Sequence, residues 1–333
     1  MQFGVSRRAM TEAKPPVSAA SPSVTVCICT HSPRMALLDR VIASIAMQSA
    51  APDRFSVLIV DNASAPPLDG GTLDPLSRVG IPARMVLEPI PGLMRARLRA
   101  IRETDTDWIL FVDDDNVLTP SFVAEGLAFV VRNPNVACVG GKLLLPDEVL
   151  CPKWAQPYLP YLGIKDLGNE PQSGISAEWQ EWEPPGAGLL CHRKVLERFA
   201  EMVDQDRAVF ALGRSGSGNL ASCDDALLTS LAFGFGMATA YNPAMVLYHH
   251  IGQQRLHLRY LLRLMAAYGR SHVALARVRH GAVETPPYYA SYPALFATLL
   301  YSLQKNASKS LRFAFGMAAY HIAGWRAHRS EAS

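Results

Sequence analysis

The sequence lacks several features that would assign it to a simple class. Its six cysteines include no Cys-x-x-Cys pair, and Cys27 and Cys29 alternate with apolar residues as on one face of a strand. We therefore expect buried free thiols in a reducing compartment. No uninterrupted apolar run approaches ~20 residues, so a conventional membrane span is not expected either.

The start of the chain also lacks the pattern of a secretory signal. The stretch MQFGVSRRAMTEAKPPVSAASPS contains basic residues but no apolar run behind them. Its Pro, Ser and Ala content predicts a disordered segment over residues 1–22. We expect a cytoplasmic protein.

Acidic residues are scarce in the last quarter of the chain. Residues 251–333 contain eleven Arg and Lys but only Glu284 and Glu331, a net charge of +9. The first 250 residues contain 21 basic and 27 acidic groups, a net charge of −6. The length of 333 residues suits one large domain or two modest ones, and the apolar content of 49% predicts a packed core.

The sequence does contain a regular alternation of strand and helix patterns. Short apolar runs rich in β-branched residues alternate with segments whose apolar residues recur every three or four positions. This alternation predicts an α/β fold, a mostly parallel sheet flanked by helices, and residues 146–185 are expected to loop over the ligand crevice. The predicted strands are 24–30, 55–60, 84–88, 107–112, 136–145, 186–191, 237–241 and 244–249, and the predicted helices are 37–47, 92–104, 119–132, 193–202, 224–233, 255–279, 289–305 and 309–328.

Polar residues follow three of the predicted strands directly. Thr30 and His31 come at the end of the first strand, Asp61 and Asn62 after the second, and Asp113–Asp115 after the fourth. In open α/β sheets, ligands bind beyond the carboxyl ends of the strands. We therefore expect these side chains, although distant in sequence, to meet at one crevice.

The triplet Asp113-Asp114-Asp115 is a candidate metal site. Adjacent carboxylates repel one another, and hard cations such as Mg²⁺ and Mn²⁺ prefer oxygen ligands. In an extended segment, Asp113 and Asp115 would face one side and Asp114 the other. A carboxylate site this sparse favours an ion that also binds substrate phosphates, and a solvated turn is the alternative explanation.

Four motifs in order resemble those of a family 2 nucleotide-sugar glycosyltransferase with the GT-A fold. They are VTVCICTHSPR, LIVDNAS, PGLMRARLRAI and LFVDDDN, and a helix ending near Gln48 follows the first. The resemblance covers residues 23–250 and implies a catalytic domain there, with a C-terminal helical extension over residues 251–333.

The resemblance also implies roles for individual residues. Contacts to the donor nucleotide would come from Thr30, His31, Arg34, Asp61, Asn62, Arg97, Asp113 and Asp114. Mn²⁺ or Mg²⁺ would be bound by Asp113, Asp115 and His249, with His250 as the alternative to His249.

A catalytic base is expected at the start of a later helix. Inverting transfer requires a carboxylate that accepts the proton of the acceptor hydroxyl. The family has a Glu-Asp pair at this position, and this chain has Asp224 and Asp225 in SCDDALL. The resemblance implies that Asp225 is the base, while the role of the shorter Asp224 stays open. Both carboxylates also suit a helix N-terminus, where negative charge gains ~0.3–1 kcal/mol.

Two further features are candidates for the sugar or acceptor site. Gly186-Ala187-Gly188 permits close backbone approach, and the resemblance puts it beside the donor sugar or the acceptor. Trp182, together with Trp179, could form a wall on which a sugar stacks, and packing in a core or lid is the alternative.

The basic tail has two interpretations. Arg255, Arg259 and Arg263 recur every four residues on a predicted amphipathic helix, which could lie on an anionic membrane surface or pack on the catalytic domain. No nucleic-acid-binding module accompanies the charge, so nucleic acid is not an expected partner.

These observations predict a metal-dependent, inverting glycosyltransferase. We expect a nucleoside-diphosphate sugar as donor, with a UDP-sugar favoured, and a glycan or lipid-linked acceptor at the cytoplasmic face of a membrane. A nucleotidyltransferase is disfavoured because its Gly-rich opening is absent after residues 24–30. The other alternative is a catalytically silent donor-binding or scaffold protein at the membrane surface.

Overall fold

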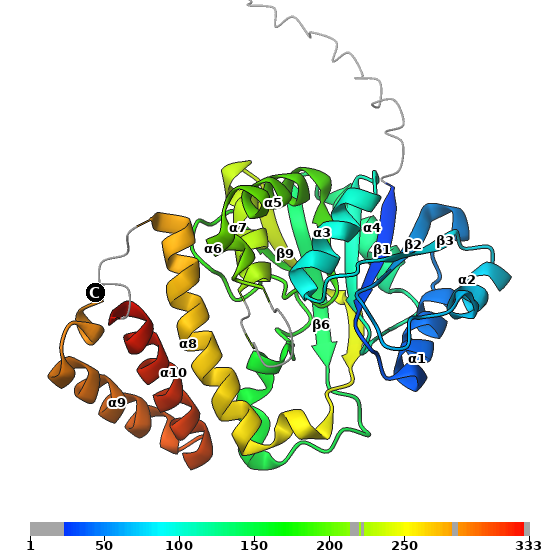
Figure 1. Ribbon diagram of the computed structural model, residues 1–333. Coiled ribbons are helices and arrows are strands. Elements are labelled where there is room, and N and C mark those ends of the chain that lie inside the picture. Colours follow the sequence, from blue (N-terminus) through cyan, green and yellow to red (C-terminus); the bar gives the residue numbers. More distant parts are fainter. Residues whose placement is uncertain (1–22, 214–219, 221–222, 282–285, 330–333) are drawn as a thin grey trace, which may run out of the picture.

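A computed structural model describes residues 23–213, 220, 223–281 and 286–329 (Figure 1). The predicted disordered segment 1–22 lies outside the described residues, and so do residues 214–219, whose sequence RSGSGN is typical of a flexible turn. Within the described part, nine strands form one sheet in the order β3-β2-β1-β4-β8-β6-β9-β5, with β7 paired to β9. Helices cover both faces of this sheet, which confirms the predicted α/β class.

The first half of the sheet is parallel, because a helix connects each strand to the next. β1 (Val24–Thr30) lies between β2 (Phe55–Asp61) and β4 (Trp108–Asp113), and β3 (Ala83–Leu87) pairs with β2. Beyond β4 the sheet is mixed, since β8 runs antiparallel to both β4 and β6 while β6 and β9 are parallel. These later strands are β5 (Asn116–Leu118), β6 (Val136–Leu144), β7 (Gln172–Gly174), β8 (Leu189–His192) and β9 (Ala238–His249).

Side chains of the buried strands alternate between two hydrophobic clusters. Val26 and Ile28 belong to the cluster under α1 and α4, whereas Cys27 belongs to the cluster under α3, α5 and α7. The six cysteines are free thiols, and four of them are buried as expected, while Cys29 and Cys151 are only partly buried. The helices are α1 (Met35–Ala46), α2 (Asp74–Arg78), α3 (Leu93–Glu103), α4 (Phe122–Arg132), α5 (Arg193–Gln205), α6 (Arg207–Phe210) and α7 (Asp224–Gly234).

Strand β9 corrects the expectation of two short strands at 237–241 and 244–249. It runs without a break through Asn242 and Pro243, because β6 shifts its register against β9 between Gly140 and Lys142. A side chain at Gly141 would place its Cβ 1.8 Å from the Met245 carbonyl oxygen. The two backbones therefore approach so closely that only glycine fits there.

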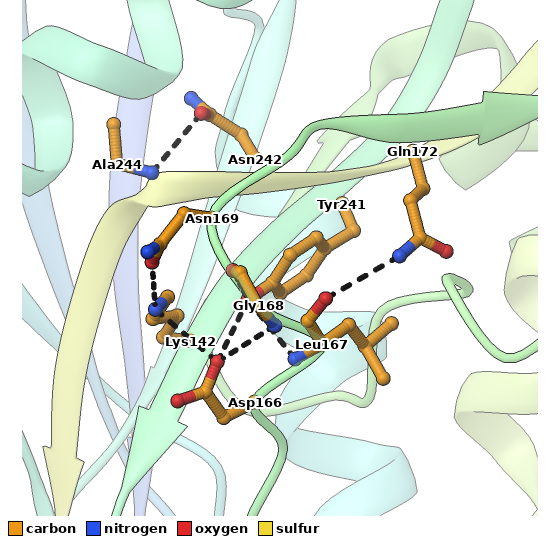
Figure 2. A network of polar contacts seen from close by, with 9 residues as sticks. All are labelled: Lys142, Asp166, Leu167, Gly168, Asn169, Gln172, Tyr241, Asn242 and Ala244. Atoms are coloured by element: carbon orange, nitrogen blue, oxygen red, sulfur yellow. Dashed lines mark hydrogen bonds and ion pairs between the residues drawn. The ribbon is translucent and has the colours of Figure 1, made fainter.

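Residues 146–185 are more ordered than the expected loop. They contain a 3₁₀ segment, η3 (Lys153–Leu162), and the short strand β7. Figure 2 shows how the segment between them is held on the sheet: Lys142 Nζ lies 3.2 Å from Asp166 Oδ1, and Tyr241 Oη donates to the Gly168 carbonyl at 3.0 Å. Because both anchors come from β6 and β9, this segment has a defined position beside the sheet.

Three helices follow the sheet. They are α8 (Leu258–His280), α9 (Tyr292–Ala307) and α10 (Leu311–Arg329). Leu261, Leu264 and Met265 of α8 are buried in a third cluster with Tyr158 of η3 and Phe313 of α10. The tail helix thus packs on the rest of the molecule, the second of the two interpretations of its sequence.

The crossing of α8 and α10 is unusually close. A Cβ at Gly269 of α8 would lie 2.1 Å from the Tyr320 carbonyl oxygen, and Gly324 of α10 lies at the same contact. Short 3₁₀ segments complete the chain at Pro52–Arg54, Gly70–Leu73, Gln253–Leu256 and Pro287–Tyr289. Among the described residues, we find no helix that is both long and apolar enough to cross a bilayer.

Candidate active site

The carboxyl ends of β1, β2 and β4 lie side by side, as the sequence predicted. Thr30 is opposite Asp61 in the β1–β2 register, and Cys29 is opposite Asp113 in the β1–β4 register. The Thr30 hydroxyl donates a hydrogen bond to the Asp114 carboxylate across this edge. Residues separated by more than eighty positions therefore meet at one edge of the sheet.

Asp61 and Asn62 organise the loops that leave this edge. The Asp61 carboxylate accepts the backbone N–H groups of Ser64 and Leu68 at 3.0 and 2.9 Å. The Asn62 side-chain oxygen accepts the Gly92 N–H at 2.7 Å, and His31 Nδ1 lies 2.6 Å from the Asn62 carbonyl oxygen. These polar groups hold the loop after β2 against the start of α3, which is the turn-forming role that Asp and Asn favour.

The acidic triplet forms a tight turn and not the expected extended segment. Strand β4 ends at Asp113, and β5 begins at Asn116. The turn between them consists of Asp114 and Asp115. The Asp113 N–H donates to the Asn116 side-chain oxygen at 3.2 Å, and the Asp115 carbonyl accepts the His250 N–H at 2.8 Å. The expected alternation, with Asp113 and Asp115 on one side and Asp114 on the other, therefore does not apply to this turn. The Asp114 carboxylate faces Thr30.

Electrostatics differ sharply along this turn. Burial raises the pKa of Asp114 to about 6, and the neighbouring charges of Asp115 and Asp113 add to that rise. Burial also disfavours ionised Asp115, but the nearby His249 and Arg255 outweigh it and hold the pKa of Asp115 below its ordinary value. Asp115 is thus an anion at neutral pH.

Asp115 and His249 are the residues best placed to share a metal ion. Asp115 Oδ1 lies 3.4 Å from His249 Nε2, a separation that two neighbouring ligands of one small cation can adopt. His250 instead turns its Nδ1 toward Glu148, 3.6 Å away, and its carbonyl accepts from Arg34 at 3.0 Å.

The donor set fits an ion only if the substrate completes the coordination. In the described part of the chain, no three His, Cys, Asp or Glu side chains are gathered around one point as a ready metal site. Mg²⁺ is commonly held by one or two carboxylates with substrate phosphates and water. Asp115 and His249 suit that arrangement, and Asp113 is placed at the turn beside them.

Asp224 and Asp225 open α7, but their surroundings differ. Asp224 forms an ion pair with Arg97 of α3, with only 6% and 12% of the two side chains exposed. Burial opposes the charge on Arg97, yet Asp224 and Asp113 outweigh it and raise the pKa of Arg97 above its ordinary value. The Asp225 carboxylate accepts backbone N–H groups of Gly186 and Ala226 at 3.0 and 2.8 Å.

The Gly186–Gly188 segment is a turn before β8 and not part of the strand. A Cβ at Gly186 would lie 2.3 Å from Arg97 Nη2, and Gly188 has a positive φ of 70° while its N–H donates to the Phe111 carbonyl. Ala187 between them is buried. The glycines thus bring a backbone N–H up to Asp225.

Trp182 packs inward beside this turn. A Cβ on Gly174 of β7 would lie 2.8 Å from its ring, and its indole nitrogen is buried with no hydrogen-bond partner in the described residues. Trp179 is largely exposed. The packing interpretation therefore describes Trp182 in this structure.

Several residues near the site were missed by sequence reasoning. Arg255 Nη1 lies 3.6 Å from Asp115 Oδ2, and the buried Glu183 accepts the Thr229 hydroxyl at 2.8 Å. Lys165 donates to the Glu183 carbonyl, and burial lowers its pKa to about 8. Arg255 was noticed only as one charge of a helix, while Glu183 and Lys165 lie in an irregular segment without a motif.

The sheet, its switch to mixed pairing and the acidic turn at the end of β4 agree with the predicted GT-A fold class. Residues 25–167 match the family model for Glycosyl transferase family 2. This part of the chain is therefore similar to family 2 glycosyltransferases, the family that its motifs resemble.

Two proteins similar to this chain are both named as glycosyltransferases. An N-acetylglucosaminyltransferase from Sinorhizobium fredii is 33% identical over 141 residues, covering 40% of this chain and 32% of that protein. The match thus spans about a third of its length. The mannosyltransferase PcManGT from Pyrobaculum calidifontis, solved with GDP-mannose and Mn²⁺, superimposes with a TM-score of 0.57 at 18% identity over 94% of this chain and 88% of that one, which shows a shared fold.

Proposed function

We propose that this protein is a metal-dependent, inverting glycosyltransferase that moves a sugar from a nucleoside-diphosphate sugar to a hydroxyl of a glycan or lipid-linked acceptor. The observation that carries this proposal is the pairing of an oriented carboxylate, Asp225, with the anionic turn that contains Asp115. Arg97 lies near both the turn and Asp225, because its charge interacts with Asp113 of the turn and with Asp225 of α7.

Each residue has a role in this proposal. Asp115 and His249 would hold Mn²⁺ or Mg²⁺, which when bound offsets the charge of the leaving diphosphate. Thr30, His31, Arg34, Asp61 and Asn62 would border the nucleotide, and Arg97 with Arg255 would add positive charge near its phosphates.

Asp225 would act as the general base. Two backbone N–H groups fix the direction of its carboxylate, so that it can accept the proton of an acceptor hydroxyl as that oxygen attacks the sugar. Asp224 is engaged with Arg97 and would serve to position this helix terminus. We place the donor sugar beside Gly186–Gly188.

The names of the similar proteins suggest which donors to test first. One is named an N-acetylglucosaminyltransferase, so we would first test a donor of N-acetylglucosamine, and the other was solved with GDP-mannose, so GDP-mannose is the second donor to test. We also propose that the acceptor is met at the cytoplasmic face of a membrane, because residues 251–333 carry eleven basic and two acidic groups.

The test is donor binding and turnover with Mn²⁺, Mg²⁺ or EDTA, for the wild type, Asp115→Asn and the exposed control Asp204→Asn. We expect Asp115→Asn to lose at least about tenfold in metal-dependent donor affinity, because a charged ligand of the ion is removed, while Asp204→Asn behaves as wild type. Equal donor binding with and without metal would contradict the metal assignment. Binding of donors without any transfer would favour the alternative, a catalytically silent donor-binding or scaffold protein.

A further inference from the structure

The outward face of α9 carries an apolar stripe. Tyr292, Phe296 and Leu300 recur every four residues, and Tyr301 follows Leu300 on the same exposed half of the helix. The opposite side, which includes Leu295, Ser302 and Asn306, is buried. The stripe consists of Tyr292, Phe296, Leu300 and Tyr301, which are 67%, 63%, 45% and 63% exposed.

Positive charge is located at both ends of the α9 stripe. Lys305 Nζ lies 5.8 Å from the centre of the Tyr301 ring, and Arg329 Cζ lies 5.3 Å from the centre of the Tyr292 ring. Lys309 is exposed just beyond α9. The sequence from 286 to 329 contains five basic residues and no Asp or Glu, so no acidic side chain of this segment offsets the charge.

The helix that the sequence singled out for membrane contact has its apolar side occupied. Leu261, Leu264 and Met265 of α8 are fully buried against η3 and α10. Figure 1 shows α9 beside α10, at the end of the molecule opposite α1 and α2. The exposed apolar stripe is therefore on α9 and not on α8, and Tyr288, Leu311 and Phe315 add further exposed apolar side chains to the tail.

We propose that the α9 stripe docks the protein on the surface of a bilayer containing anionic lipids. An interfacial helix combines an aromatic and aliphatic face with Lys and Arg at its borders, because the rings enter the headgroup region while the cations reach the lipid phosphates. Long Lys side chains suit such a border, since their stems cover apolar surface and their ammonium groups stay at the headgroups.

A second copy of this chain fits the α9 stripe less well. An isologous contact places the same patch of two subunits face to face. Antiparallel pairing of two α9 helices would bring Lys305 of one copy toward Arg329 of the other, and like charges repel. The charge of the stripe therefore favours a negatively charged partner surface.

This inference rests on the proposed function only for the idea that the acceptor is lipid-linked, and vesicle binding tests it separately. The full chain is sedimented with vesicles of phosphatidylcholine alone or mixed with phosphatidylglycerol. We expect binding to the anionic vesicles that weakens with salt, and a loss of at least about tenfold for Phe296→Ser/Tyr301→Ser or for Lys305→Glu/Lys309→Glu.

Two matched variants control for general effects of exposed apolar and basic residues. Phe235→Ser changes an exposed ring beyond α7, and Arg132→Glu reverses an exposed charge at the end of α4. Both should bind vesicles as wild type does. Equal binding of the wild type and Phe296→Ser/Tyr301→Ser, or equal binding to neutral and anionic vesicles, would overturn the proposal.

Two further measurements separate the possible failures. If the wild type ignores anionic vesicles but Phe296→Ser/Tyr301→Ser shifts its oligomeric state in analytical ultracentrifugation, the α9 stripe is an interface between copies and the proposal is wrong. Donor turnover without vesicles should be the same in wild type and in Phe296→Ser/Tyr301→Ser. If the wild-type protein binds vesicles but turns over no donor, the proposed glycosyltransferase function is contradicted, while the proposed docking surface is supported.

Discussion

Acidic side chains lie at two places near the carboxyl ends of the strands, at the start of α7 and in the turn after β4. They differ in how closely basic side chains contact them. In the cluster at the start of α7, Asp224 and Arg97 form a close and nearly buried ion pair. In the turn after β4, Asp115 lies 3.4 Å from His249 and 3.6 Å from Arg255, with 18% of its side chain exposed. We call the first cluster closed, because its ion pair is close and nearly buried. We call the second cluster open, because its contacts are longer and part of the Asp115 side chain is exposed.

This difference suggests a division of labour. A buried ion pair that loses one partner is left with an uncompensated charge, so the closed cluster holds α3 and α7 together. In the open cluster, Asp115 Oδ1 lies 3.4 Å from His249 Nε2 and also accepts the Asn116 side-chain amide at 3.2 Å, so its partners are polar groups at longer distances than in the Asp224–Arg97 pair. We therefore propose that the closed cluster positions Asp225, and that the open cluster binds the charged part of the substrate.

The largest expected effect is on turnover, from Asp225 next to the closed cluster. Asp225→Asn should lower the rate of sugar transfer by about 10²–10⁴-fold, the usual contribution of a general base, with donor affinity unchanged. Steady-state transfer and donor binding by calorimetry would measure the two effects. Normal turnover by this variant would mean that another group accepts the proton.

The next effect is on stability. Arg97→Met should lower the free energy of unfolding by about 3–5 kcal/mol, because Asp224 stays buried without this cation. Arg102→Met is the control, since it removes an exposed pair with Asp204 and should cost no more than about 1 kcal/mol. Urea unfolding of both variants would test the contrast. Similar losses would show that the two pairs do not differ as their burial implies.

The buried Lys165 should make the free energy of unfolding depend on pH. Burial lowers its folded-state pKa from 10.5 to about 8, so the unfolded chain binds more protons between these values and stability should rise with pH across that window. The rise should reach at most about 3 kcal/mol, at ~1.4 kcal/mol per pKa unit. Unfolding of the wild type and Lys165→Met from pH 7 to 10.5 would measure it, and parallel curves would exclude Lys165 as the source.

The smallest effect is expected in the open cluster. Arg255→Met should change the free energy of unfolding by only about 1 kcal/mol, because its guanidinium lies beyond hydrogen-bond distance of Asp115. The same urea experiment as for Arg97→Met applies. A loss as large as that of Arg97→Met would show that Asp115 is as firmly paired as Asp224, and the comparison between the clusters would fail.

Residues at strand ends were predicted well. Thr30, Asp61 and Asp113 follow recognisable apolar runs, and parallel strands bring their carboxyl ends to one edge. Lys165, Glu183 and Arg255 could not be found in the same way. They reach the site through an irregular segment and a 3₁₀ turn, whose paths depend on contacts with β6, β9 and the tail helices.

The sequence by itself determined the alternation of strands and helices in the first half of the molecule and the polar residues at the strand ends, because hydrophobic periodicity and short motifs are local properties. Only the tertiary structure decided that Asp224 pairs with Arg97, that His249 and not His250 faces Asp115, and that α9 and not α8 has its apolar face outward. Each of these depends on which distant surfaces bury one another, and the free energy of that burial is shared among residues that no local pattern connects.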